Sequence, residues 1–97
     1  MSKRFDPEDE LYKAVLTLKT KEEVAAFLDD LCTIKERQDM AQRFEVAVLL
    51  SDKKNYGEIS ALTGASSATI SRVNRCLQYG KDGYTTVIAR LSEGGDE

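Results

Sequence analysis

The sequence predicts an all-α protein, and three observations carry this prediction. Apolar residues recur three and four positions apart in successive segments, the spacing that places them on one face of a helix. Residues that cap helix N-termini precede several of these segments, often with a glutamate three positions later. The 97 residues include one proline and six glycines, which argues against a β-rich or disordered chain. The length suits a single domain, residues 1–97, with a thin core that oligomerisation would help to complete.

The first predicted helix opens at Asp6, an N-cap residue, with Pro7 at the first helical position and acidic residues beside the positive end of the helix dipole. Its apolar stripe consists of Leu11, Val15 and Leu18. A helix this short is marginal alone, because few backbone hydrogen bonds offset the cost of starting it. It must therefore dock on its own chain or on another subunit, and the pattern does not distinguish the two.

Two capping boxes organise the next part of the chain. Thr20 and Glu23 form the first box, and Thr33 and Glu36 form the second. They predict helices over residues 21–31 and 34–52. The inward face of the first helix is predicted to be Val24, Phe27, Leu28 and Leu31. The second helix ends in a run, residues 46–50, that is apolar all round, which predicts a central helix surrounded by protein and more easily enclosed by two subunits than by one.

Residues 57–79 are predicted to form two helices joined by a tight turn. Asn55 can cap the first helix, with Glu58 closing the box. Gly64 stands where this helix ends, because glycine enters the left-handed conformation without strain. Ser66 can cap the second helix only three residues after Thr63. This is the spacing of a helix-turn-helix, although such helix pairs also occur as ordinary packing units of all-α proteins.

The second helix of this pair, predicted over residues 66–78, carries the strongest functional signal. Ile70, Val73 and Leu77 are predicted to point inward, which leaves outward Ser67, Ala68, Thr69, Ser71, Arg72, Arg75 and Gln78. Small and hydrogen-bonding side chains near a helix start suit close approach to base edges, and arginines suit phosphates or guanine. No aspartate or glutamate occurs from Ile59 to Lys81, in a chain that is otherwise acidic.

A turn over residues 80–83 leads to the last predicted helix, residues 84–91. Its inward residues are predicted to be Val87, Ile88 and Leu91. The acidic, glycine-rich tail, residues 92–97, is predicted to fray.

Charge is unevenly distributed along the chain, whose net charge is −3. Residues 1–52 hold 8 basic and 12 acidic groups, residues 53–81 hold 5 basic and 1 acidic, and residues 82–97 hold 1 basic and 4 acidic. A positive segment inside a negative protein favours one docking orientation on a phosphate backbone. Lys53 and Lys54 could contact phosphates that flank the site, although exposed loop lysines are most often simply solvated.

Composition argues against several function classes. Without histidine the chain lacks the commonest general base and the usual catalytic triads, so we do not expect an enzyme. Cys32 and Cys76 cannot form a zinc site with the usual ligands, and we interpret them as small buried residues of helices, with a disulfide as the alternative. No apolar run approaches 18 residues and the N-terminus lacks a signal peptide, so we expect a cytoplasmic protein without a membrane partner.

Two stretches resemble the Trp repressor family: residues 31–37 with the following Arg43, and the run at 59–72, Ile-Ser-Ala-Leu-Thr-Gly-Ala-Ser-Ser-Ala-Thr-Ile-Ser-Arg. Within that family the whole chain is similar to the YerC/YecD group of Gram-positive bacteria. The resemblance implies a six-helix subunit whose N-terminal helices interleave with those of a partner in a two-fold homodimer. It also implies two helix-turn-helix units that enter successive major grooves of an operator, about 34 Å apart.

The resemblance further implies a ligand site. In the tryptophan repressor the amino acid lies between the central and recognition helices, and two arginines hold its carboxylate, each able to bind it bidentately. The matching positions here are Arg43 and Arg72, with Thr33 also lining the site and Cys76 standing where the repressor has a serine. A thiol is a weaker acceptor than a hydroxyl, so another small acid, or no ligand, stays open beside tryptophan. The alternative for Arg43 is a surface ion pair with Asp39 or Glu36, and for Arg72 a phosphate contact alone.

We therefore interpret the chain as a transcriptional regulator, a repressor that binds double-stranded operator DNA as a homodimer. Control by a small carboxylate effector stays open beside regulation without a ligand. The alternative is a protein-interaction module that uses the same helix pair on a partner from the transcription machinery. The candidate DNA-binding residues are Lys53, Lys54, Ser66, Ser67, Ala68, Thr69, Ser71, Arg72, Arg75 and Lys81. The candidate ligand-binding residues are Thr33, Arg43, Arg72 and Cys76, and no metal or other cofactor is expected.

Overall fold

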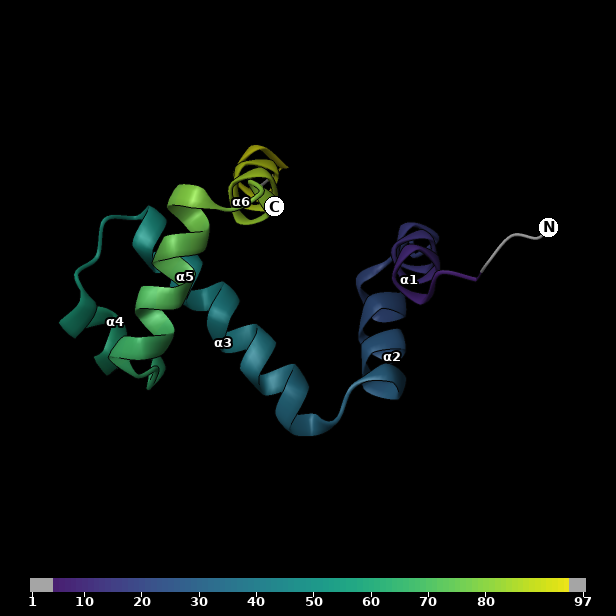
Figure 1. Cartoon of the computed structure of the whole chain (residues 1–97), viewed down its shortest axis with the longest axis horizontal. Helices are drawn as coiled ribbons and strands as arrows, with labels where there is room; N and C mark the ends of the chain where they lie inside the picture. Colours follow the sequence, from purple (N-terminus) through teal and green to yellow (C-terminus); the bar gives the residue numbers. More distant parts are fainter. Residues whose placement is uncertain (1–4, 95–97) are drawn as a thin grey trace. The chain divides into compact units, whose positions relative to one another are not determined.

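The computed structural model describes residues 5–94, and all its regular elements within that range are α-helices, as predicted. The six helices are α1 (Pro7–Leu16), α2 (Lys21–Leu31), α3 (Ile34–Ser51), α4 (Tyr56–Thr63), α5 (Ser67–Tyr79) and α6 (Gly83–Gly94) (Figure 1). Contacts divide the chain into two compact units, residues 1–37 and residues 38–97, which we call the N-terminal unit and the C-terminal unit. None of the helices in the described range is long and apolar enough to cross a membrane.

The predicted starts of α1, α3 and α4 are confirmed by their capping hydrogen bonds. Asp6 caps α1 by accepting hydrogen bonds from the backbone N–H groups of Glu8 and Asp9. The boxes of Thr33 with Glu36 and of Asn55 with Glu58 are closed in both directions, with hydrogen bonds of 2.8–3.0 Å.

The box at the start of α2 differs from the prediction. Thr20 accepts from the Glu23 N–H at 3.0 Å, but the Glu23 carboxylate accepts from the N–H of Lys19 at 2.8 Å instead of that of Thr20. The helix start is still satisfied, because the carboxylate reaches one residue further back along the chain. The first helix also ends earlier than its apolar stripe suggests, since α1 stops at Leu16 and Leu18 lies beyond it.

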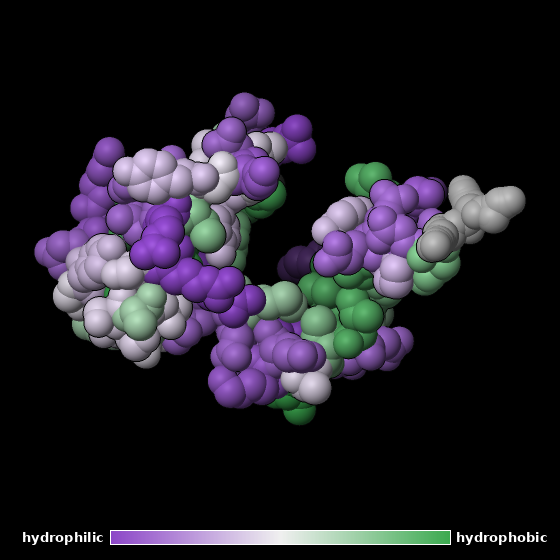
Figure 2. Space-filling model, in the orientation of Figure 1, coloured by the Kyte–Doolittle hydropathy of each residue, from purple (hydrophilic) through white to green (hydrophobic). Residues whose placement is uncertain are grey.

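The N-terminal unit consists of α1 and α2, which cross at an angle (Figure 1), together with the first turn of α3. Neither α1 nor α2 contains a fully buried residue. The predicted inward face of α2 is therefore wrong in part: Phe27 and Leu28 are half-buried, but Val24 is exposed and Leu31 is 51% exposed. Two helices of 10 and 11 residues can cover only a narrow strip of each other, which leaves hydrophobic side chains on the surface of this unit (Figure 2).

The hydrophobic core lies in the C-terminal unit. Its fully buried residues are Val46, Ala47, Ile59, Ala65, Ile70 and Val73, contributed by α3, α4, α5 and the turn before α5. The prediction of a central α3 is met only in part, because residues 48–50 are half-buried. The core is thus thin, as expected for a chain of this length.

The last helix, α6, departs from its prediction at both ends. It begins at Gly83 and continues to Gly94, so residues 92–94 are helical and not frayed, while residues 95–97 lie outside the described range. Ile88 is half-buried and packs on the core, but Val87 and Leu91 are exposed, which contradicts their predicted inward position. One side of α6 therefore packs on the core, whereas Val87 and Leu91 are left exposed to solvent by the described residues of the C-terminal unit.

Candidate nucleic-acid interface

The turn between α4 and α5 is built from local hydrogen bonds. Gly64 ends α4 in the left-handed conformation, at φ 77°, and its N–H donates to the carbonyl of Ser60. The hydroxyl of Thr63 accepts from the N–H of Ala65 at 3.0 Å, and Ala65 is buried. The side-chain amide of Gln42 in α3 donates to the carbonyl of Thr63 at 3.2 Å. The turn, residues 64–66, is therefore anchored both within itself and to α3.

The start of α5 is fixed by Ser66. Its side chain accepts from the N–H of Thr69 at 3.2 Å, and its hydroxyl also lies 3.2 Å from the Thr69 hydroxyl. Ile70 and Val73 then anchor the inner side of α5 in the core, and Leu77 is half-buried beside them. The hydroxyls of Ser66 and Thr69 are thus already engaged in the cap, whereas the outer side of α5 is left open.

The outer side of α5 carries most of the predicted base-reading residues. Ser67, Ala68, Ser71, Arg72 and Arg75 are exposed, and Thr69 is half-buried. At 3.6 residues per turn, positions 68, 71, 72 and 75 fall within a sector of about 100°, opposite Ile70 and Val73. Tyr79, one turn after Arg75, falls in the same sector. We call the sector with these five positions, 68, 71, 72, 75 and 79, the outer face of α5.

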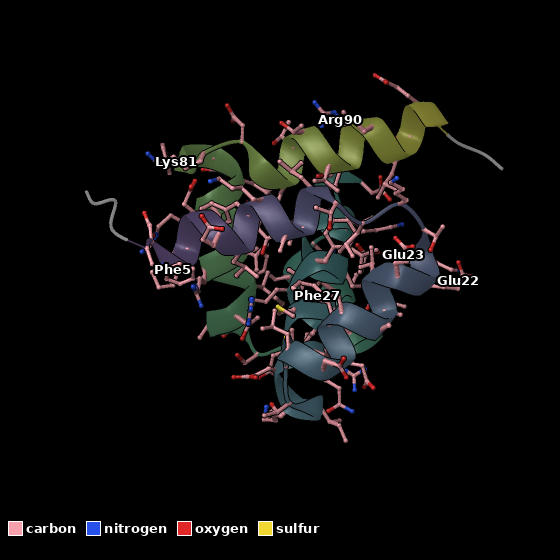
Figure 3. All side chains as sticks on the ribbon, turned by 90° about the vertical axis from the view of Figure 1, so that its right-hand side faces the viewer. Phe5, Glu22, Glu23, Phe27, Lys81 and Arg90 are labelled. Carbon is pink, nitrogen blue, oxygen red and sulfur yellow. The ribbon has the colours of Figure 1, made fainter. Side chains whose placement is uncertain are left out.

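The candidate phosphate-binding cations are free within the part of the chain that the structure describes. Arg72 and Arg75 are exposed residues of α5. Lys81 lies in the turn before α6 (Figure 3). Lys53 and Lys54 follow α3, where Lys53 adopts a left-handed conformation at φ 67°. All five side chains are exposed, and residues 5–94 offer none of them an ion pair or a side-chain hydrogen bond.

The predicted ligand residues are placed differently from one another. Thr33 caps α3 through the N–H of Glu36 and lies in the N-terminal unit, whereas Arg43, Arg72 and Cys76 belong to the C-terminal unit. Arg43 is half-buried in α3 and forms no ion pair with Asp39, Glu36 or another described residue, so the surface-pair alternative is not realised. Cys76 is exposed, which contradicts its interpretation as a buried residue, and Cys32 is half-buried; both are free thiols.

A pocket of about 570 Å³ lies within the C-terminal unit. Its lining residues are Phe44, Cys76, Gly80, Lys81, Gly83, Tyr84 and Val87. Cys76 is the one predicted ligand residue among them, and neither Arg43 nor Arg72 lines the pocket. Sequence reasoning missed Phe44 and Tyr84, because aromatic residues at helical spacing predict a core as readily as a pocket.

Sequence reasoning also missed Tyr79, the last residue of α5, whose side chain is 81% exposed. It lies four residues after Arg75 and seven after Arg72, so helical spacing alone places it on the outer face of α5. That spacing was the signal that could have found it.

Comparisons of sequence and of structure with known proteins find similarity to Trp-repressor-like proteins. Residues 8–92 match the family model described as Trp repressor protein. The uncharacterised protein YerC of Bacillus subtilis is 52% identical over 85 residues, which cover 88% of this chain and 82% of that protein. The crystal structure of a candidate Trp repressor from Staphylococcus aureus is similar with a TM-score of 0.86 at 44% identity, covering 96% of this chain and 93% of that one. A TrpR-like protein from Eubacterium eligens is similar with a TM-score of 0.84 at 48% identity, covering 91% of each chain.

Proposed function

The chain belongs to the Trp repressor protein family, and on that basis we propose that it is a DNA-binding transcriptional regulator, a repressor that binds operator DNA as a homodimer. The α4–α5 pair acts as the helix-turn-helix, with α5 as the recognition helix. The observation that carries the proposal is the outer face of α5, where Arg72 and Arg75 have no acidic partner.

Electrostatics supports this assignment. The segment from Ile59 to Lys81 contains no acidic residue, so no carboxylate within it competes with phosphate for Arg72, Arg75 or Lys81; Glu58, at the start of α4, is engaged in the capping box with Asn55. Each cation that neutralises a phosphate releases condensed counterions, which gives binding its strength and its salt dependence. Lys53 and Lys54 extend the cationic set along the chain to the turn that precedes α4.

The composition of the exposed start of α5 suits sequence reading. Ser67, Ala68 and Ser71 lie in the first half of α5, and short side chains there allow the helix backbone to approach base edges closely. Hydroxyls can donate to or accept from several bases, and an alanine methyl can contact the methyl group of thymine. Specificity is therefore assigned to the start of α5 and affinity to its cations.

Uncovered apolar surface supports the homodimer. No residue of α1 or α2 is fully buried, and Leu16 at the end of α1 is 83% exposed. In α6, Val87 and Leu91 are exposed as well. Apolar surface on this scale favours association, and a two-fold dimer presents two α5 helices to a palindromic operator.

We also propose that a small carboxylate controls binding, with Arg43 and Arg72 as its ligands. Arg43 is half-buried and has no anionic partner among residues 5–94, a position in which a guanidinium benefits from a bound carboxylate. Because Arg72 stands on the recognition helix, a ligand held there would alter the position of α5 on DNA.

The test is selection of bound duplexes from a random pool by the purified full-length chain, with and without small aromatic acids. A regulator enriches a palindrome, and an effector changes that enrichment. The rival function is an interaction module that docks a protein partner, which the uncovered apolar surface of α1 and α2 would also serve. If no sequence is enriched and a mixed-sequence duplex is not bound at low salt, the chain is not a DNA-binding regulator. That result would favour the protein-interaction module.

A further inference from the structure

Tyr79 is an aromatic side chain that the protein leaves in water. It is the last residue of α5 and is 81% exposed. It is not among the lining residues of the pocket, although Cys76 and Gly80 on either side of it are. Its hydroxyl has no hydrogen-bond partner among residues 5–94. Neither the core, the pocket nor an internal hydrogen bond within that range accounts for this side chain.

The backbone fixes where Tyr79 stands. The N–H of Gly80 donates to the carbonyl of Cys76 at 2.9 Å, and a Cβ on Gly80 would lie only 2.5 Å from that carbonyl oxygen. The chain therefore turns tightly at the end of α5, with Tyr79 before the turn and Lys81 after it. Tyr79 shares the outer face of α5 with Arg75 one turn earlier and Arg72 two turns earlier.

The length of α5 decides what Tyr79 can reach. Thirteen residues give a helix of about 18–20 Å, whereas the major groove is about 12 Å wide. If residues in the first half of α5 read base edges, its last turn extends to the sugar-phosphate backbone at the groove wall. Tyrosine hydroxyls are among the side-chain groups that donate to DNA phosphates.

We propose that Tyr79 is a DNA-contacting residue whose phenolic hydroxyl donates a hydrogen bond to a backbone phosphate at the edge of the groove. This inference rests on the proposed function. The contact positions α5 along the groove and carries no sequence information, because every nucleotide presents the same phosphate. The hydroxyl of Tyr79 would be an uncharged donor to phosphate, whereas the other proposed phosphate contacts are made by lysines and arginines.

The test compares Tyr79→Phe and Tyr79→Ala with the unmodified chain for binding to a labelled duplex of mixed sequence, about 30 base pairs or three helical turns long. Binding is measured over a series of salt concentrations. We expect Tyr79→Phe to weaken binding about tenfold, the effect of losing a hydrogen bond to a charged group. The slope of affinity against salt should stay unchanged because no charge is lost, whereas Arg75→Ala should make it shallower. The matched control is Tyr12→Phe, in exposed α1 of the N-terminal unit, which should bind as the unmodified chain does.

Unaltered binding by Tyr79→Phe would overturn this inference while leaving the proposed function intact, provided that Arg75→Ala is impaired. The molar mass of Tyr79→Ala in solution is measured by light scattering. A mass that differs from that of the unmodified chain would assign the ring to an interface between subunits and overturn the phosphate contact. A lower unfolding midpoint of Tyr79→Phe would likewise overturn it in favour of a structural role. No duplex binding by the unmodified chain at low salt would remove both the inference and the proposed function.

Discussion

The side-chain amide of Gln42 in α3 donates a 3.2 Å hydrogen bond to the carbonyl of Thr63, the last residue of α4. This bond joins positions 21 residues apart in the chain. It fixes the end of α4 on α3 immediately before Gly64, where the chain turns toward α5. The placement of α5 thus depends partly on one glutamine of the central helix.

Gln42→Leu is expected to lower the free energy of unfolding by about 1 kcal/mol, because a partly buried carbonyl loses its donor. Urea denaturation followed by circular dichroism measures this change. Gln38→Leu, one turn earlier on α3 and exposed, is the matched control and should change stability by less than about 0.5 kcal/mol. Equal losses in the two variants would contradict a specific role for the Gln42 bond.

Gly64→Ala should destabilise the protein through backbone strain alone. Gly64 has φ 77°, and no atom lies within 4 Å of the position its Cβ would take. The expected cost is about 1–2 kcal/mol, which lowers the melting temperature by roughly 4–16 °C in a domain of this size. Thermal unfolding measures it, and an unchanged melting temperature would show that the turn relaxes.

Lys53→Gly should raise stability by up to about 1 kcal/mol, because Lys53 adopts a left-handed conformation, φ 67°, that glycine enters more easily. Lys53→Ala is the control, since it removes the charge and keeps the strain, so its stability should match that of the unmodified chain. If Lys53 contacts phosphate, both variants lose affinity for duplex DNA equally despite their different stabilities. If Lys53→Ala and Lys53→Gly both bind the duplex as tightly as the unmodified chain, Lys53 makes no phosphate contact.

If the chain forms the proposed homodimer, Leu16→Ser should weaken it. Leu16 is 83% exposed in the single chain, so the substitution should change the stability of the subunit little. If Leu16 is buried in the dimer, each of its two copies contributes at least about 1.5 kcal/mol to association, and the serine variant loses both contributions. The two losses together amount to about 3 kcal/mol, so sedimentation equilibrium should show a dissociation constant higher by roughly a hundredfold. Leu62→Ser, another exposed leucine but in α4, is the control, and a similar effect there would place the interface on the helix pair instead.

Arg75→Ala should weaken binding to all duplexes alike and make the salt slope shallower by roughly one unit per subunit. Titration of a labelled duplex at several salt concentrations measures both effects. Arg90→Ala provides a control of equal charge, because Arg90 lies on α6 and outside the acid-free segment (Figure 3). The same shift in both variants would indicate a general field effect without a specific contact.

Local signals in the sequence predicted the helices well, because caps act within a few residues. Thr33 with Glu36 and Asn55 with Glu58 form the expected reciprocal bonds, and Gly64 ends α4 as predicted. What covers each apolar face was not predictable, since periodicity identifies a face and says nothing about its partner. Leu31 and Leu91 follow the helical pattern, yet they are 51% and 60% exposed.

The candidate interface was partly predictable for the same reason. The exposed positions of Ser71, Arg72 and Arg75 follow from the inward positions of Ile70 and Val73 on the same helix.

Contacts between helices were not predictable in this way. The ion pair of Arg37 with Asp29 at 3.1 Å joins α2 to α3 within the N-terminal unit, and no spacing rule within one helix anticipates it.

The lack of any fully buried residue in α1 and α2 has a consequence for the lifetime of the protein in the cell. Helices without a core open readily, and an opened helix is a substrate for proteases. If the chain forms the proposed homodimer, a newly made chain that has met no second copy should therefore be degraded quickly, while paired chains survive. Turnover would then slow as synthesis increases, so that cellular levels rise more steeply than the rate of expression.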